Sequence, residues 1–380
     1  MENFEAMFHS IGYQVDWVTL DIILPVGISF YTFQALSYTI DVYQKKLPAT
    51  HDVIEFFAYI SFFPQLVAGP IERATNLLPQ FQMERKFDYS RAVDGMRQML
   101  WGFFKKLVIA DNCAYAVNNY WGAYDQLPSF SIFFLGVLFT FQIYCDFSGY
   151  SDIAIGTARL FGINLMRNFN FPYFSRSIPE FWRRWHISLM TWFRDYIYFP
   201  LGGSRCAKWK VIRNTILVFF ISGLWHGANW TFICWGLYHA CLIAFFILLG
   251  INTKTKDVVA QGRLLPTAKE IGQLIVTFLL VIFGWIIFRA ENITQLSDIC
   301  HAMIENQFFD PNYVYGKKYL ISAIVMIIIE WLQRDKQHAL QLPNNTLFRK
   351  RVVRWSLYVG MYLYIISSTG QSQTFLYFQF

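Results

Sequence analysis

About nine to ten apolar segments, most of them near the length that a helix needs to cross a lipid bilayer, run through this chain. An upright membrane-spanning helix needs about 20 apolar residues. The segments lie at residues 22–43, 53–69, 99–118, 130–146, 151–165, 214–224, 230–250, 271–288, 319–332 and 353–369. The sixth is short enough to be a partial span. Only 15% of the residues are charged, against about a quarter in a soluble domain. The sequence therefore predicts an all-α, multi-pass membrane protein with a single membrane-embedded domain over residues 1–380.

Several of these segments contain residues that disturb a membrane helix. The second contains Pro64, Gly69 and Pro70, the third contains Lys105 and Lys106, and Gly149 separates the fourth from the fifth. Non-helical backbone at membrane depth is tolerated only where protein or a water-filled cavity satisfies its polar groups. The interruptions therefore predict short re-entrant elements around an internal cavity.

The formal net charge of +7 is better explained by basic cytoplasmic loops than by nucleic-acid binding. The loop over residues 334–354 is the best candidate for the cytoplasmic side, although Lys and Arg also flank both ends of the second segment. The first 20 residues lack the basic and apolar regions of a secretory signal. Their apolar residues recur at helical spacing, which predicts a helix lying on the membrane surface over residues 1–21.

Two histidines, His186 and His226, lie among tryptophans and charged residues between apolar segments. Ionisable residues at membrane depth are costly, so they indicate a functional site by default. Ser177 and Glu180 have the spacing of a capping box, which predicts a helix that starts there and continues past His186. In such a helix His186 shares the apolar face with Trp182, Met190 and Phe193. The alternative is a core histidine that is hydrogen-bonded and has no chemical role.

His226 follows the apolar run 215–221 and lies between Gly223 and Gly227, a spacing that lets another helix approach closely. Trp225 and Trp230 bracket it, and Asn229 could bond across helices. An imidazole there is suited to acid–base chemistry because its ordinary pKa is about 6.5. A buried histidine that donates to a carbonyl is the competing interpretation, but two histidines in one low-charge region favour a functional site.

The other charged residues of this region have structural alternatives. Arg183, Arg184, Arg194 and Asp195 are consistent with an ion network that anchors a helix at the interface. The alternative for Arg183, Arg184 or Lys105 is attraction of an anionic donor. Asp146 is a further charge within an apolar segment. Asp152 and Arg159 are two helical turns apart, which predicts an ion pair between them.

Six cysteines are scattered without the spacing of a metal site, so neither a disulfide nor a bound metal is expected. Sequence fingerprints of serine hydrolases, P-loop nucleotide hydrolases and dinucleotide-binding folds are also missing from the chain.

At residues 62–81, 142–163, 168–203, 222–230 and 375–380 the sequence resembles the membrane-bound O-acyltransferase superfamily. The matching text includes SIPEFWRRWHISLMTWFRDYIYFPLGG and SGLWHGANW. The YFPLGG ending resembles the branch that acetylates alginate and related exopolysaccharides. The branch that transfers D-alanine to teichoic acids shares the WRRWH and WHG elements.

The resemblance implies a fold: a ring of about nine to ten tilted transmembrane helices around short re-entrant helices. It implies that His226 is the essential histidine and that His186 is a second polar position, with Trp185, Trp225, Asn229, Arg183, Arg184, Asp195 and Asp146 as supporting or substrate-binding residues. Members of the family usually have further hydrophobic segments before the part that matches residues 22–43, so the resemblance also implies that these N-terminal helices are missing from this chain.

The implied function is acyl transfer, most simply acetyl transfer, at the bacterial inner membrane. A thioester donor, acetyl-CoA or an acylated carrier, approaches from the cytoplasm, and no cofactor is bound. The acceptor is a hydroxyl of an exported polysaccharide or of a periplasmic esterase-like relay protein, and His226 acts as general base. The alternatives are D-alanyl transfer and a non-enzymatic glycan or acyl channel, since interrupted helices also mark transport pathways.

Overall fold

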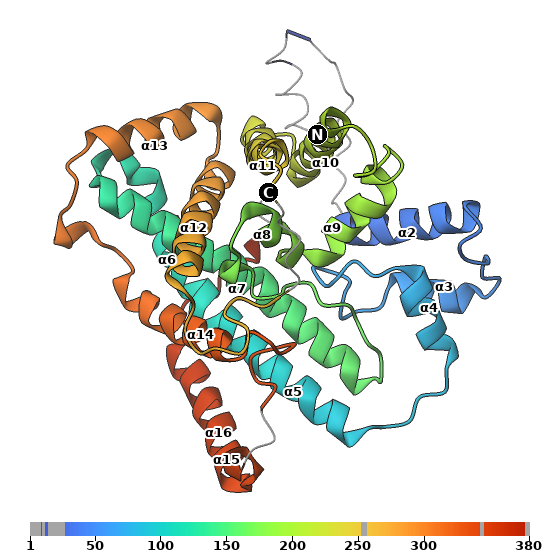
Figure 1. Ribbon diagram of the computed structural model, residues 1–380. Helices are drawn as coiled ribbons and strands as arrows, with labels where there is room; N and C mark the ends of the chain where they lie inside the picture. The colour runs from blue at the N-terminus through green and yellow to red at the C-terminus, as the bar shows by residue number, and fades with distance from the viewer. Residues whose placement is uncertain (1–8, 10–11, 14–26, 252–256, 343–345, 377–380) are drawn as a thin grey trace.

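The computed structural model describes residues 9, 12–13, 27–251, 257–342 and 346–376, and their regular secondary structure is helical throughout (Figure 1). The predicted all-α class is confirmed for this part of the chain. The predicted surface helix over residues 1–21 and the start of the segment 22–43 lie outside the described residues.

The longer helices are α2 (Ile28–Tyr43), α5 (Tyr89–Phe103), α6 (Asp111–Tyr120), α7 (Ser129–Leu160), α10 (Lys208–His226), α11 (Trp230–Leu248), α12 (Ala268–Arg289), α13 (Ile293–Glu305), α14 (Leu320–Leu332) and α16 (Arg351–Ser368). The shorter ones are α3 (Val53–Ile60), α4 (Ala74–Gln82), α8 (Ile178–Arg184), α9 (Ile187–Phe193) and α15 (Thr346–Arg349). Two π-helical segments, η1 (Phe104–Ala110) and η4 (Arg194–Tyr198), and four short 3₁₀ segments, η2 (Trp121–Gln126), η3 (Pro172–Phe174), η5 (Pro311–Tyr313) and η6 (Lys317–Tyr319), complete the order.

Within the described residues, three helices are long and apolar enough to cross a membrane, namely α7, α11 and α12. α10 has 19 residues and extends beyond the apolar run of the sixth predicted segment, but it is not one of these three helices. The second predicted segment is not a continuous helix, because α3 ends at Ile60 and Pro64 lies in the turns that follow. The sequence did not predict α13.

The prediction that Gly149 separates two spans is wrong, because α7 runs unbroken for 32 residues through it. Gly149 instead lies against Gly102 of α5. A Cβ atom at Gly149 would lie 2.9 Å from the carbonyl oxygen of Gly102, and one at Gly102 would lie 2.6 Å from that of Gly149. Glycine is present here because it lets two helices approach closely, not because the helix breaks.

We expect Gly149→Ala to destabilise the protein by about 1–3 kcal/mol, because the added methyl group must displace backbone atoms of η1 and α5. The measurement is thermal unfolding of the purified protein in one detergent. Gly272→Ala is the matched control, since a Cβ atom at this helical glycine would meet nothing within 4 Å. Equal melting temperatures for the two variants would show that the contact between α5 and α7 tolerates a larger separation.

The two lysines that interrupt the third segment lie in a π-helical stretch between α5 and α6. Lys105 forms an ion pair with Asp152 of α7 at 2.6 Å, and Lys106 forms one with Asp146 at 2.6 Å. π-Helical turns are rare and are often found at functional sites. Here the wider turn lets two consecutive lysines reach α7 from the interior of the protein.

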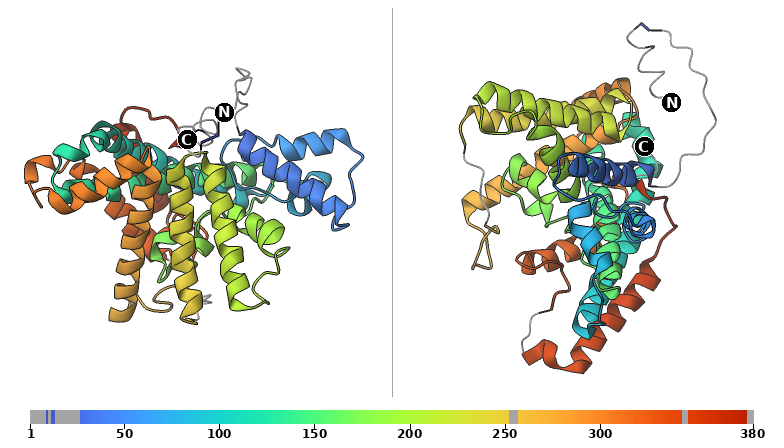
Figure 2. Two further views of the ribbon diagram at one scale, coloured as in Figure 1. Left: turned by 90° about the horizontal axis from the view of Figure 1, so that it is seen from above. Right: turned by 90° about the vertical axis from the view of Figure 1, so that its right-hand side faces the viewer.

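Helices α10, α11 and α12 lie side by side, as the left view of Figure 2 shows. Gly223 of α10 and Gly236 of α11 let these two helices approach each other closely. A Cβ atom at Gly223 would lie 2.5 Å from the carbonyl oxygen of Phe232. The close approach that the Gly223 and Gly227 spacing predicted is therefore confirmed, with α11 as the partner helix.

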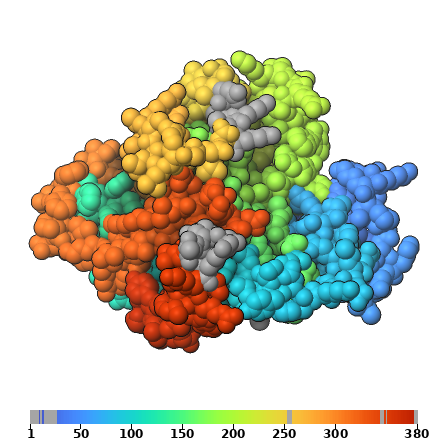
Figure 3. All heavy atoms as spheres, turned by 60° about the horizontal axis from the view of Figure 1, so that its bottom comes forward, coloured from blue at the N-terminus to red at the C-terminus, as the bar shows by residue number. Residues whose placement is uncertain are grey.

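Loops from distant parts of the chain gather at two ends of the molecule. At one end Arg334 donates to the carbonyl oxygens of Val259 and Ala260, and Arg97 donates to the hydroxyl of Tyr358 at 2.6 Å. This end brings α5, α16 and residues 334–342 together on the face drawn in Figure 3. It includes the basic segment 334–354 that the sequence singled out.

The other end joins the last turns of α6, α10 and α12. Asn229 donates to the carbonyl oxygen of Glu291, Arg289 donates to Asn118, and Asn118 donates to Gln373.

Candidate active site

The prediction of one helix from Ser177 past His186 is correct for its start and wrong for its second half. Ser177 caps α8 by accepting from the backbone N–H of Glu180 at 3.3 Å, as predicted. The carboxylate of Glu180 binds Arg176 and Arg184 rather than closing a capping box. The helix then ends at Arg184, before His186.

His186 has a left-handed backbone conformation, with φ 44° and ψ 52°. Such values are uncommon for a residue other than glycine and recur at functional sites. Residues 168–170 supply the bonds that a continuous helix would have made. The carbonyl oxygen of Asn168 accepts from the N–H of Ile187, and the N–H of Asn170 donates to Arg184, both at 2.9 Å. The predicted face of Trp182, His186, Met190 and Phe193 therefore does not exist as one helical stripe.

His226 is the last residue of α10. The chain leaves the helix at Gly227, with φ 153°, where a side chain would meet the ring of Phe232. In the described part of the chain the imidazole of His226 has no hydrogen bond, and it packs against aromatic rings. Its ring centroid lies 4.8 Å from that of Trp225, 5.2 Å from Trp235 and 5.1 Å from Phe288.

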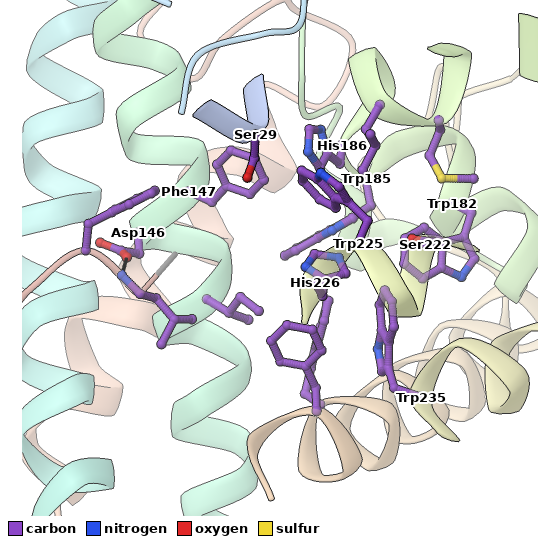
Figure 4. A pocket seen from close by; sticks show the side chains of 17 residues that line it. Ser29, Asp146, Phe147, Trp182, Trp185, His186, Ser222, Trp225, His226 and Trp235 are labelled. Atoms are coloured by element: carbon purple, nitrogen blue, oxygen red, sulfur yellow. Dashed lines mark hydrogen bonds between the residues drawn. The ribbon is translucent and has the colours of Figure 1, made fainter. Parts of the chain in front are cut away.

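The two histidines share one internal cavity of about 110 Å³ (Figure 4). Its wall is formed by Ser29, Ile143, Asp146, Phe147, Trp182, Trp185, His186, Leu189, Met190, Ser222, Trp225, His226, Trp235, Trp285, Phe288, Phe375 and Leu376. The ring of Trp225 lies between the histidines, 6.4 Å from His186 and 4.8 Å from His226. A water needs about 10–15 Å³ of such space, so the cavity holds several waters or a small acyl group.

The cavity is mostly aromatic and has few polar groups. Nε2 of His186 is buried without a hydrogen-bond partner in the described residues, and so are the indole N–H groups of Trp182, Trp235 and Trp285. Buried polar atoms in native proteins are normally satisfied, and unpaired ones often have a chemical role or bind water. The unpaired acceptor and donors therefore mark this cavity as the candidate site of chemistry.

A second, larger apolar groove lies next to this cavity, and Ser29 and Trp225 belong to both walls. The groove has a volume of about 550 Å³ and lies between α2, the α9–η4 segment and α10. The shared residues therefore connect the wall of the two-histidine cavity to that of the groove.

Asp146 lies in the cavity wall on α7. It pairs with Lys106 and accepts from the backbone N–H of Leu376 at 2.7 Å. Lys106 also pairs with Asp111 at 2.7 Å. These contacts bring Phe375 and Leu376, close to the end of the chain, into the same cavity as the histidines.

Of the predicted supporting residues, Trp185, Trp225 and Asp146 line the cavity, whereas Asn229, Arg183, Arg184 and Asp195 do not. Asn229 caps α11 by accepting from Thr231 at 3.1 Å, and its amide N–H donates to Glu291. Arg184 pairs with Glu180 at 2.8 Å, as in the structural alternative. Arg183 is exposed and is not part of the cavity wall.

Asp195 also lies outside the cavity wall, where it pairs with Arg194 at 2.8 Å and with Arg73 at 3.6 Å. The predicted pair between Asp152 and Arg159 is wrong. Asp152 binds Lys105, and Arg159 binds Asp94 of α5 at 2.5 Å. Both residues have closer partners on neighbouring elements, Asp152 on η1 and Arg159 on α5, than they offer each other.

Sequence reasoning missed Asn168, Trp235, Trp285 and the Phe375–Leu376 pair. Asn168 lies in a segment without helical periodicity, so its link to His186 left no pattern. The tryptophans lie on α11 and α12 and look like ordinary apolar residues of a span. The terminal aromatic segment belongs to the text that resembles the family, but its sequence does not say which helix it meets.

The helical structure of the described residues, with three helices long and apolar enough to cross a membrane and a cavity shared by two histidines, is that of an integral membrane protein. The sequence model of MBOAT, the membrane-bound O-acyltransferase family, matches residues 44–284, which is more than half of the chain. The chain therefore belongs to this family.

The relatives differ in the polymer that their names specify. The chain is 45% identical over 304 residues to "Probable alginate O-acetylase AlgI" of Pseudomonas aeruginosa, a match that covers 80% of this chain and 56% of that protein. It is 32% identical over 409 residues to the peptidoglycan O-acetyltransferase of Helicobacter pylori, covering 95% and 76%. It is 29% identical over 285 residues to the teichoic acid D-alanyltransferase of Bacillus subtilis, covering 70% and 69%. The matches to the alginate O-acetylases span 56–60% of their length.

Proposed function

We propose that this chain transfers an acetyl group across the bacterial inner membrane, from a cytoplasmic thioester to a hydroxyl group on the other side. The observation that carries the proposal is the cavity in which His186 and His226, from separate elements, meet beside unpaired buried donors. The names of the relatives support an exported glycan as the final acceptor. The hydroxyl belongs either to that glycan or to a periplasmic esterase-like relay protein.

The proposed orientation follows from charge. Cytoplasmic loops of membrane proteins are enriched in Lys and Arg, so the end that contains Arg97, Arg334 and the start of α16 faces the cytoplasm. The end that joins α6, α10 and α12 then faces the periplasm. We further propose that the short helices α8 and α9 are the central re-entrant elements, with the longer tilted helices arranged as a ring around them.

In the proposed reaction His226 acts as general base. It takes the proton of the acceptor hydroxyl while the alcohol oxygen attacks the thioester carbonyl carbon. The tetrahedral intermediate then collapses, the carbon–sulfur bond breaks, and the thiolate takes the proton back from His226. The products are an acetyl ester and a free thiol, so the base is regenerated. Such assistance is worth about 10²- to 10⁴-fold in rate.

The developing oxyanion needs hydrogen-bond donors near His226. The side-chain amide of Asn229 is committed to Glu291 and to the cap of α11. The backbone N–H of Gly223 lies within α10, where helical bonding uses it. The indole N–H of Trp235 is unpaired, and its ring centroid lies 5.2 Å from that of His226. We assign the oxyanion-binding role to Trp235.

D-alanyl transfer is the second candidate, because the teichoic acid D-alanyltransferase of Bacillus subtilis is also a relative. The same cavity and the same base would serve both acyl groups. A glycan channel without chemistry is the non-enzymatic alternative, and it needs no proton acceptor at position 226.

The test is mass analysis of the surface glycans of the host with and without this chain. We expect acetyl esters to be lost in the deletion strain and restored when the chain is supplied again. Loss of D-alanyl esters in place of acetyl esters would assign the second candidate. Unchanged esters with altered glycan export would reject acyl transfer in favour of a channel.

A further inference from the structure

Asn168 bonds to Nδ1 of His186, the ring nitrogen opposite the unpaired Nε2. Nδ1 of His186 lies 3.0 Å from Oδ1 of Asn168. Both residues are buried, and Asn168 is completely inaccessible to solvent. A histidine nitrogen and an amide group can bond in two ways, so the neighbours decide which atom carries the hydrogen.

The neighbours of Asn168 determine the orientation of its side-chain amide. The backbone N–H of Ser188 can only donate, and it lies 3.3 Å from Oδ1 of Asn168. The hydroxyl of Ser188 donates to the same oxygen at 2.9 Å, and Nδ2 of Asn168 donates to the hydroxyl of Ser151 at 3.1 Å. Rotating the amide would place its N–H₂ group against the N–H of Ser188. The atom that faces His186 is therefore the carbonyl oxygen.

The orientation of this amide determines the tautomer of His186. A carbonyl oxygen only accepts, so Nδ1 of His186 must carry the proton. In the neutral ring the other nitrogen, Nε2, then has a free lone pair. Nε2 is the atom without a partner among the described residues, on a ring that forms part of the cavity wall. The hydroxyl of Ser188 lies farther from Nδ1, at 3.4 Å, and already donates to Asn168.

We propose that Asn168 is a positioning residue that holds His186 as the Nδ1–H tautomer, so that Nε2 accepts a hydrogen bond from a hydroxyl of the acceptor in the cavity. This proposal rests on the proposed acyl transfer for its role in the reaction. It gives the two histidines different tasks. His226 takes the proton, whereas neutral His186 orients the acceptor and cannot donate to the oxyanion.

The backbone supports this arrangement. The left-handed conformation of His186 and the bond from Ile187 to the carbonyl oxygen of Asn168 hold the ring beside residue 168 rather than on a helix face. Orientation of a functional histidine by a partner on its other nitrogen is a general requirement, because the partner selects the tautomer.

The direct test is solid-state NMR of the full chain in lipid bilayers with ¹⁵N-labelled histidine. The His186 signals are identified by their loss in His186→Gln. We expect a protonated Nδ1 and an unprotonated Nε2 in the native protein and in Asn168→Asp, whose carboxylate still accepts. In Asn168→Ala the proton should move to Nε2. A native protein protonated on Nε2, or an Asn168→Ala variant that keeps Nδ1–H, overturns the proposal.

A second, functional test measures acetyl esters on the host glycan in cells that contain equal amounts of each variant in the membrane. We expect Asn168→Ala to reduce the esters by about 3- to 10-fold, because one hydrogen bond to the acceptor is lost, and Asn168→Asp to restore part of the loss. Asn170→Ala is the matched control, because Asn170 meets Arg184 through backbone atoms only. A tautomer change with unchanged esters removes His186 from the reaction. Failure of the acyl-transfer proposal itself appears as native protein that adds no esters, with the tautomer result unaffected.

Discussion

Replacing His226 with glutamine should reduce acetyl esters on the host glycan by about 10²- to 10⁴-fold, because glutamine has similar size but cannot take the hydroxyl proton. The imidazole packs against aromatic rings and has no hydrogen bond in the part of the chain that the structure describes. Its loss therefore breaks no hydrogen bond there, and folding should be little affected. The measurement is mass analysis of glycan esters, normalised to the amount of the chain in isolated membranes.

His301→Gln is the matched control for this experiment. His301 lies on α13, is exposed, and bonds the carbonyl oxygen of Ser297 in its own helix. We expect this variant to keep the native ester content. Native acetylation by the His226→Gln variant at normal abundance would remove His226 as the base and would favour the channel alternative.

Trp235→Phe should lower acetyl transfer by about 10²- to 10³-fold, which is the usual cost of removing one oxyanion donor. Phenylalanine keeps an aromatic ring against His226 and Trp182 but has no N–H group. The indole N–H is unpaired, so its removal leaves no partner unsatisfied. The same mass analysis of glycan esters measures the effect, together with the melting temperature of each purified variant.

Trp121→Phe separates the lost N–H group from the lost ring volume. Trp121 is also buried, with 3% of its surface exposed, and its indole N–H is also unpaired, but it does not belong to the cavity wall. Similar losses of stability with a loss of acetylation only at position 235 support the oxyanion assignment. Equal losses of acetylation in the two variants would mean that the effect is one of packing.

Much of the helical architecture could be read from the order of apolar residues. Long apolar runs can be accommodated in a bilayer only as helices or barrels that satisfy their own backbone, and α11 and α12 closely match the segments predicted for them. Gly149 shows the limit of this reasoning. A glycine inside an apolar run fits both a helix break and a close helix contact, and only the position of Gly102 on α5 distinguishes them.

The candidate site was predictable in kind but not in detail. His186 and His226 were recognisable because imidazoles are unusual among apolar segments. Their common cavity depends on where α8, α9 and α10 pack, and the local sequence does not contain that information. Arg184 and Asp195 illustrate the reverse case, since charges near the histidines in sequence form ion pairs outside the cavity wall.

The sequence by itself determined a helical membrane protein, its family resemblance and the two histidines, because local composition and spacing carry those properties. Only the tertiary structure decided which groups meet. The break at His186, the tautomer set by Asn168, the pairing of Asp146 with Lys106 and the end of the chain, and the unpaired indole of Trp235 all depend on contacts between residues far apart in sequence. Side-chain chemistry is fixed by residue type, whereas hydrogen-bond partners and enclosure arise only when distant segments pack together.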